Sequence, residues 1–302
     1  MAFLKNNIYL SGKTSVFFIS IMLLFVMLNY SFSFANSEKK HTQHITESGH
    51  AEGVKIELET NPVPIEASIS TLLSFSLLDK NGKPLKGITI SHERILHVVI
   101  ISEDFRIFSH VHPEDFGEIT QKMINEAKFN IKYTFPKAGR YLVAIDAAAG
   151  EKHISRLMYV DVKGSPAMEP PLECYAFEKN FKGYWVKLSV SPKTVNAGVE
   201  TELRYNITRD GNPVTDLETY LAAAMHLAIV NKNLSDFKHT HGLIPGTPGE
   251  HPMGHIHGIF NERFGPDIVA KVTFPEKGTY NIFGEFKHNG KVILTEFTLT
   301  VK

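Results

Sequence analysis

The sequence predicts an all-β protein with two tandem immunoglobulin-like β-sandwich domains after an N-terminal signal peptide. Three observations support this prediction. Short stretches alternate apolar and polar residues, which is the period of a half-buried strand. Turn residues separate these stretches, and neither half of the chain shows a convincing amphipathic helix. Four sequence blocks also occur twice in the same order, which indicates a tandem duplication.

The repeat aligns two histidine-containing segments of each copy. The first copy has Leu-His-Val-Val-Ile-Ile at 96–101 and Phe-Ser-His-Val-His at 108–112. The second copy has Met-His-Leu-Ala-Ile-Val at 225–230 and Phe-Lys-His-Thr-His at 237–241. In both copies a Gly-x-Pro block precedes these segments and a Phe-Pro-x-x-Gly-x-Tyr block follows them. We therefore expect two domains of equivalent topology.

The domain boundaries follow from the repeat and from local composition. We expect a first sandwich over residues 54–163, a proline-containing linker over 164–183 and a second sandwich over 184–302. An insertion in the second sandwich covers 242–272. The best helix candidate, 118–128, is expected to form only a helical turn or a loop.

Each Phe-Pro-x-x-Gly-x-Tyr block ends in a tyrosine at the start of a predicted late strand. Tyr141 ends the first block and Tyr280 ends the second. A tyrosine at this place is typical of the tyrosine corner of immunoglobulin-type sandwiches. The two side chains are therefore expected to occupy equivalent places.

The N-terminus has the pattern of an export signal. Lys5 and Lys13 precede an apolar run over 16–28, which leads into small residues and then a polar stretch. A basic region, an apolar region and a small-residue end are typical of a cleavable secretory signal. We expect residues 1–35 to be a signal peptide and 36–53 a flexible segment that contains histidines.

The alternative for this segment is an uncleaved N-terminal membrane anchor. Phe32 and Phe34 prolong the apolar run toward the length that spans a bilayer. No later segment is long and apolar enough to span one. The mature chain is therefore expected to have no membrane span and to lie in the periplasm or outside the cell.

Composition excludes several classes of function. The 32 basic residues balance 32 acidic residues, which argues against a strongly basic nucleic-acid binder. The chain has one cysteine, Cys174, so no internal disulfide can form. Cys174 lies in the expected linker, away from the histidines, which argues against a blue-copper site. No nucleophile elbow, His-Glu-x-x-His motif or phosphate-binding loop is present, so we expect a protein that is not an enzyme.

The histidines, 15 in all, are the unusual feature of the composition. Each copy contains three histidines with the same spacing, called a trio here. A hairpin centred on residues 103–104 would pair His97 with His110, and a hairpin centred on residues 232–233 would pair His226 with His239 in the second copy. The third histidine of each trio lies two residues further along, so it shares the face of the other two. The candidate metal ligands of the two trios are His97, His110 and His112, and His226, His239 and His241.

Two interpretations of the trios remain open. Neutral imidazoles bind Zn, Cu, Ni or Fe, so each trio could hold an ion. The same faces carry apolar residues such as Val99 and Ala228, so the histidines could instead be hydrogen-bonded core residues. His92, His153 and His288 have no evident partner in the sequence.

The insertion is a separate signal for metal binding. Its candidate ligands are His251, Met253, His255 and His257. Alternate residues of an extended segment lie on one side, so all four could line one surface. A thioether beside imidazoles favours copper. We expect this loop to make the second domain the better metal site; the alternative is a solvated loop without a role.

The run Leu-His-x-x-Ile-x-Ser-x-Asp-x-x-x-Phe-x-His-x-His-Pro at 96–113, with the Phe-Pro-x-x-Gly-x-Tyr block, resembles exported bacterial proteins with YtkA-like immunoglobulin-type domains. Such domains are often found near heavy-metal or copper efflux components. The resemblance covers most of 54–302 as two copies. It implies immunoglobulin-type folds and an envelope location, and it carries over no catalytic residue. The second copy departs from the pattern, with Gly242 in place of Pro113.

These observations give two functional hypotheses. The first is an exported metal-binding protein that buffers or hands on an ion in the cell envelope, with a copper ion favoured and a zinc ion as the alternative. The second is a non-enzymatic structural or interaction module of tandem sandwiches with core histidines. The expected partners are the metal ion and another envelope protein, and no nucleic acid.

Overall fold

The computed structural model describes residues 53–165, 170–246 and 263–302. The predicted signal peptide and the segment 36–53, apart from Gly53, lie outside these ranges. Within them, no helix has the length and apolar character needed to cross a membrane. The described residues belong to one compact unit.

The first domain is a sandwich of two sheets. A three-stranded sheet has the order β1-β3-β7, and a six-stranded sheet has the order β2-β9-β8-β5-β6, with β4 paired to β8. Its elements are β1 (Val54–Asn61), β2 (Ile65–Glu66), β3 (Ser70–Asp79), β4 (Ile88–Thr89), β5 (His97–Ser102), β6 (Phe108–Val111), the 3-10 helix η1 (Pro113–Phe116), α1 (Gln121–Glu126), β7 (Lys128–Thr134), β8 (Gly139–Ala149) and β9 (Lys152–Lys163). The helix candidate 118–128 is thus a single short helix.

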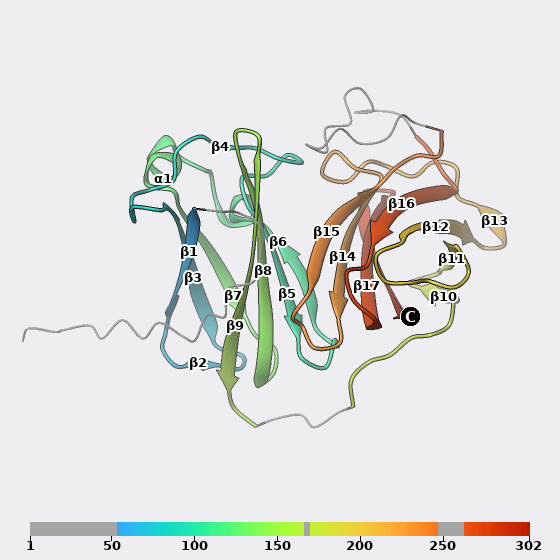
Figure 1. The fold of residues 1–302 in the computed structure, drawn as a ribbon, viewed down its shortest axis with the longest axis horizontal. Helices are drawn as coiled ribbons and strands as arrows, with labels where there is room; N and C mark the ends of the chain where they lie inside the picture. Colours follow the sequence, from blue (N-terminus) through green and yellow to red (C-terminus); the bar gives the residue numbers. More distant parts are fainter. Residues whose placement is uncertain (1–52, 166–169, 247–262) are drawn as a thin grey trace, which may run out of the picture. The chain divides into compact units, whose positions relative to one another are not determined.

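The second domain repeats this arrangement. One sheet has the order β10-β11-β12-β13 with β16 paired to β12, and the other has the order β15-β14-β17-β18. Its strands are β10 (Glu178–Phe181), β11 (Tyr184–Ser191), β12 (Glu200–Arg209), β13 (Asn212–Pro213), β14 (Met225–Asn231), β15 (Phe237–Gly242), β16 (Asp267–Thr273), β17 (Gly278–His288) and β18 (Lys291–Val301). Figure 1 shows β15, β14 and β17 side by side, with β12, β11 and β10 in a separate layer.

The two sheets of one domain correspond to those of the other strand by strand. The order β9-β8-β5-β6 matches β18-β17-β14-β15, and β1-β3-β7 matches β11-β12-β16. The prediction of an all-β protein with two tandem immunoglobulin-like sandwiches is confirmed.

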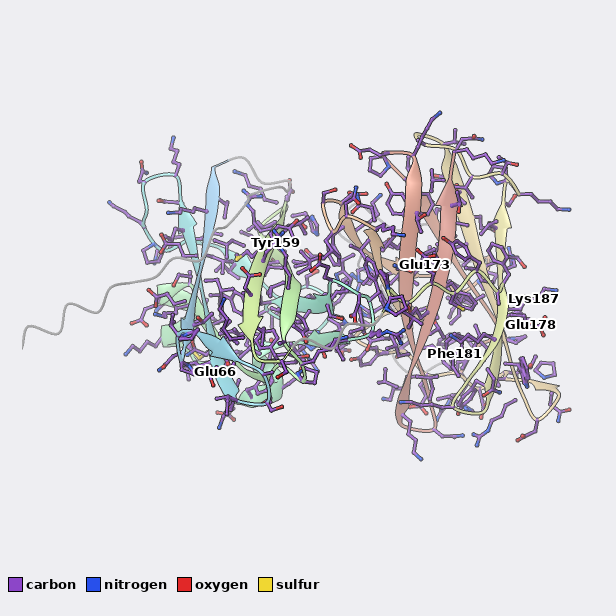
Figure 2. All side chains as sticks on the ribbon, turned by 90° about the horizontal axis from the view of Figure 1, so that it is seen from below. Glu66, Tyr159, Glu173, Glu178, Phe181 and Lys187 are labelled. Carbon is purple, nitrogen blue, oxygen red and sulfur yellow. The ribbon has the colours of Figure 1, made fainter. Side chains whose placement is uncertain are left out.

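The predicted linker 164–183 is shorter than expected. Its C-terminal part forms β10, where Glu178 pairs with Lys187 of β11, and the two side chains lie beside each other in Figure 2. Cys174, in the same range, donates its backbone N–H to the Thr298 hydroxyl at 2.6 Å. The predicted insertion, 242–272, also includes residues that belong to the sandwich, because it contains most of β16.

The strands that carry His97 and His226 are buried on both faces. In β5, Val98 and Ile100 pack into the core of the first domain, and in β14 Leu227 and Ile229 pack into that of the second. The alternate residues join a third apolar cluster built from both domains. Its buried members are Val99, Ile101, Phe105, Leu142, Ala144, Leu157, Ala228, Val230, Leu234 and Phe283. The apolar residues on the histidine face are therefore explained by packing against the other domain, not by the domain's own core.

Both tyrosine corners are present. The Tyr141 hydroxyl donates to the Lys137 carbonyl at 2.9 Å, and the Tyr280 hydroxyl donates to the Glu276 carbonyl at 3.1 Å. Each bond ties a buried ring to the turn that precedes its strand. The equivalence predicted from the repeat thus extends to individual hydrogen bonds.

We expect Tyr141→Phe to lower the free energy of unfolding by about 1 kcal/mol, because it removes one net hydrogen bond without leaving a cavity. Chemical denaturation of the full chain measures this change. Tyr280→Phe should cost a similar amount, and a negligible cost at both positions would contradict the structural role of the corner.

Candidate metal centre

The histidine trios lie on the hairpins β5–β6 and β14–β15, in a register that differs from the predicted one. His226 pairs with His241, and His239 lies opposite Ala228. In the first domain His110 lies opposite Val99. The predicted pairs His97–His110 and His226–His239 are therefore wrong by two residues.

The turn explains this shift. Ser102 donates its backbone N–H to the Ile107 carbonyl at 3.0 Å, so residues 103–106 form the loop. The Asp104 carboxylate accepts a hydrogen bond from the Ser102 hydroxyl at 2.6 Å and holds that turn. A shift of two residues preserves which face each side chain occupies, so the histidines still share a face.

Four histidines, two from each domain, converge at one centre. The ligand atoms of His97, His110, His226 and His239 all lie within 4.8 Å of one another. The side chains are almost completely buried, with 2% exposure for His110 and 3% for His239. The trios therefore do not form two distant sites, since the packing of the domains brings them together.

Backbone carbonyls define which nitrogens can bind an ion in two of these rings. Nε2 of His97 lies 3.0 Å from the Ser91 carbonyl, and Nε2 of His226 lies 3.1 Å from the Leu221 carbonyl. A carbonyl can only accept, so the proton is on Nε2 in both rings. Nδ1 of each ring therefore carries a lone pair directed into the centre.

Two carboxylates orient the other two rings, and each comes from the opposite domain. Nδ1 of His110 lies 2.9 Å from Glu285 on β17, and Nδ1 of His239 lies 2.8 Å from Asp146 on β8. With Nδ1 donating to a carboxylate, Nε2 of each ring presents its lone pair to the centre. Carboxylates commonly hold the far nitrogen of metal-binding histidines in this way and fix the orientation of the ring.

Asp146 and Glu285 were missed by the sequence analysis. They occupy matching positions of the repeat, since Asp146 lies opposite His97 in the first domain and Glu285 lies opposite His226 in the second. The signal that could have found them is an acidic residue at the same place in an otherwise apolar strand of both copies. Buried acids in such strands need partners.

The distances match those of a tetrahedral ion. Nδ1 of His97 lies 3.1 Å from Nε2 of His110, and Nδ1 of His226 lies 3.1 Å from Nε2 of His239. Metal–nitrogen bonds of 2.0–2.1 Å put tetrahedral ligand atoms about 3.3 Å apart and ring centroids about 5.2 Å apart. The observed centroid separations of the four rings range from 5.0 to 5.9 Å.

Burial favours the neutral form of three of the ligand imidazoles. It lowers the pKa of His97, His110 and His226 well below the ordinary 6.5, and neighbouring histidines reinforce the shift. Burial also raises the pKa of Glu285 to about 7. Burial opposes ionisation of Asp146, but hydrogen bonds from His153 and His239 outweigh it and hold the pKa of Asp146 below its usual value. Neutral imidazole is the form that binds a metal.

His112 and His241, the third members of the trios, flank the centre. Nε2 of His112 lies 3.2 Å from Nε2 of His110, and its Nδ1 contacts Asp115 at 3.0 Å. His241 lies 4.6 Å from His226 between ring centroids and stacks on His92 at 3.6 Å. His92, for which no sequence pattern indicates a partner, belongs to this cluster.

Several other candidates lie apart from the centre. His251, Met253, His255 and His257 fall outside the described residues, so the expected role of the insertion stays a prediction. His153 is exposed and contacts Asp146 at 2.5 Å. His288 contacts Tyr184 and Asp216 instead of the other histidines.

A family model described as a domain of unknown function (DUF8832) matches residues 49–164 and, a second time, residues 179–302. The chain belongs to the DUF8832 family. The two matches coincide with the two sandwiches, so the DUF8832 unit is one copy of the repeat. This match does not link the chain to YtkA-like domains or to copper efflux.

Solved structures give only distant likenesses to this DUF8832 protein. The adhesin InvE of Yersinia pseudotuberculosis is 13% identical, with a TM-score of 0.22 over 84% of this chain and 62% of the adhesin. The alpha-2-macroglobulin of Escherichia coli is 11% identical, with a TM-score of 0.24 over 83% of this chain and 16% of that protein. The chain thus spans less than two thirds of either. No curated protein matches the sequence significantly.

We expect Asp146→Asn to weaken metal binding about 10- to 100-fold, because the neutral amide orients and polarises His239 less than the carboxylate does. A competition titration with zinc measures the affinity. Asp161→Asn removes the same charge at an exposed position of β9 and serves as the control. Equal affinities for the two variants would contradict a role of Asp146 in the centre.

Proposed function

We propose that the chain binds one transition-metal ion between its two sandwiches. The observation that carries this proposal is the convergence of four imidazoles whose outer nitrogens are all engaged. Each outer nitrogen contacts a carbonyl or a carboxylate at 2.8 to 3.1 Å. The four inner lone pairs therefore point at one another, and a cation between them relieves their repulsion.

Charge balance supports a cation. Asp146 and Glu285 contribute two negative charges when both are ionised, which matches one divalent ion, and one negative charge when Glu285 is protonated, which matches a monovalent copper ion. A buried charge needs such compensation, because isolated ions are strongly disfavoured in a protein interior. An ion on Nε2 of His110 would also favour the ionised form of Glu285, whose carboxylate accepts the hydrogen bond that Nδ1–H of His110 donates.

The donor set supports a binding role instead of catalysis. A tetrahedral ion with four protein ligands has no open position for water or substrate, and such closed centres are structural or storage sites. We infer that the protein is not an enzyme and that it buffers the ion or hands it on.

Four imidazoles in a tetrahedral arrangement suit zinc and copper. We propose copper as the favoured ion because Met253 adds a soft donor near the second hairpin in the sequence. Zinc is the alternative. The N-terminal pattern supports export, so the proposed place of action is the cell envelope, where another envelope protein would supply or receive the ion.

The test is elemental analysis of the mature chain, purified without a histidine tag, followed by titration with zinc and, separately, with copper. We expect one equivalent of ion to bind tightly. Binding of neither metal would refute the proposal.

A second function is favoured by one observation. The inner nitrogens also lie within hydrogen-bond distance of each other, as in the His97–His110 and His226–His239 contacts of 3.1 Å. A shared proton could therefore replace the ion, and the cluster would then be a polar core of a structural or interaction module. Absence of metal from the titrations would favour this function.

A further inference from the structure

A second group of histidines overlaps the four-histidine centre. The ligand atoms of His92, His226 and His241 also lie within 4.8 Å of one another. His226 is common to both groups, whereas His92 and His241 belong only to this one. Because both groups include His226, the ligands of one are not independent of the ligands of the other.

The two groups cannot each hold an ion at the same time. Nε2 of His226 donates to the Leu221 carbonyl at 3.1 Å, which leaves Nδ1 as its one lone-pair nitrogen. A single lone pair binds one ion. While this hydrogen bond persists, the two groups are therefore alternative positions for the same ion.

Ring separations decide which position is occupied at rest. Two imidazoles on adjacent positions of one ion keep their centroids at least about 4.5 Å apart, given metal–nitrogen bonds of about 2 Å. The rings of His92 and His241 stack at 3.6 Å, so they must move apart to share an ion. The four-histidine centre already has suitable separations and is the resting position.

His92 is a buried residue in a tight turn that has exposed neighbours. Ser91 and Arg94 exchange two backbone hydrogen bonds around His92 and Glu93, which both have positive φ. The neighbouring residue Ile90 is 64% exposed, whereas His92 itself is 6% exposed. The turn therefore carries one imidazole from the surface of the first domain to the edge of the centre.

The second domain has the same turn without the imidazole. Tyr220 and Ala223 exchange the same two hydrogen bonds around Leu221 and Ala222, which also have positive φ. Leu221 therefore occupies the place of His92. The additional ligand is present on one side of the centre only.

We propose that His92, His226 and His241 form a transfer position through which the ion enters and leaves the four-histidine centre. This inference rests on the proposed function. On release, the bonds from the ion to His97, His110 and His239 break, bonds to His92 and His241 form, and the bond to His226 is kept. The exchange changes neither the charge of the ion nor the protonation of the rings.

The experiment measures transfer rates with zinc as the probe. The zinc-loaded full chain is mixed with excess chelator, and release is followed in time; uptake is followed with a zinc indicator. His92→Leu puts leucine, the residue that stands at the equivalent position 221 of the second domain, into the turn of the first domain. We expect release and uptake to be about tenfold slower, the equivalent of about 1.4 kcal/mol in each barrier.

Two further variants complete the design. Glu93→Ala copies Ala222 into the same turn and keeps His92, so its rates should equal those of the unchanged chain. His92→Asn, a residue that tolerates positive φ, should repeat the slowing if leucine disturbs folding.

The outcomes separate the transfer position from the centre itself. Unchanged rates in both His92 variants would overturn the transfer position while leaving the metal centre intact. A loss of affinity as large as that of a His239 variant would also overturn it, because His92 would then be a permanent ligand. Failure of the unchanged chain to bind zinc would refute both proposals.

Discussion

Replacing His239 by alanine is expected to abolish tight metal binding by the whole chain. The centre takes two ligands from each domain, so losing His239 leaves an incomplete three-histidine set and removes one of the two imidazoles that contact the buried Asp146 carboxylate. Loss of a group that only orients a ligand costs about 10- to 100-fold in affinity, and we expect the loss of a ligand to cost more, at least about 100-fold.

His110→Ala should have the same effect from the other domain. Titration of each variant with zinc measures both affinity and stoichiometry. Lys238→Ala, at the exposed neighbour of His239 on β15, is the control and should bind one equivalent. A fall from two equivalents to one would instead indicate an independent site in each domain and would contradict the shared centre.

The metal-free protein is expected to lose stability steeply between pH 7 and 5.5. Burial lowers the pKa of five clustered histidines, to about 3 for His112 and well below 6.5 for the others. The five are His97, His110, His112, His226 and His241. Below pH 6.5 these side chains take up protons in the unfolded chain but not in the folded one.

The sign of the effect follows from linkage. Since the unfolded state binds more protons in this range, the free energy of unfolding falls as the pH falls. At pH 5.5 the loss is roughly 1 kcal/mol for each histidine and roughly 5 kcal/mol for all five. Burial raises the pKa of Glu285 and Glu296 to about 7, so these two groups take up protons in the folded chain over the same range and offset part of the loss.

Thermal unfolding at several pH values, followed by near-ultraviolet circular dichroism, measures this loss. A saturating zinc concentration should move the transition to lower pH, because bound nitrogens cannot take up protons until the ion leaves. A melting temperature that stays constant from pH 7 to 5.5 without metal would contradict the neutral, buried cluster.

The sequence alone predicted the duplication, the strand content and the face of each histidine. These features depend on local patterns. Side chains alternate between the two faces of a strand, so His110 in β6 and His112 directly after it lie on the same face. The repeat keeps the same spacing in the second copy, so its histidines share a face as well. The tyrosine corners at Tyr141 and Tyr280 follow from a short motif for the same reason.

The hairpin register does not follow from these local patterns. A two-residue shift leaves the pattern of buried faces unchanged, so hydrophobic periodicity does not distinguish between the two registers. The Asp104 side chain, which accepts from Ser102, selects the observed turn. That contact depends on the conformation of the loop.

Only the tertiary structure decided that the two trios form one centre. His97 and His226 lie far apart in sequence and on different sandwiches, and no local pattern specifies which faces of two domains will pack. The apolar residues beside them indicated burial but not the partner. Burial against the other domain supplies that partner, and it brings Asp146 to His239 and Glu285 to His110. The physical reason is that an ion site needs ligands within a few ångströms in space, whereas sequence patterns report periodicity within one strand or hairpin.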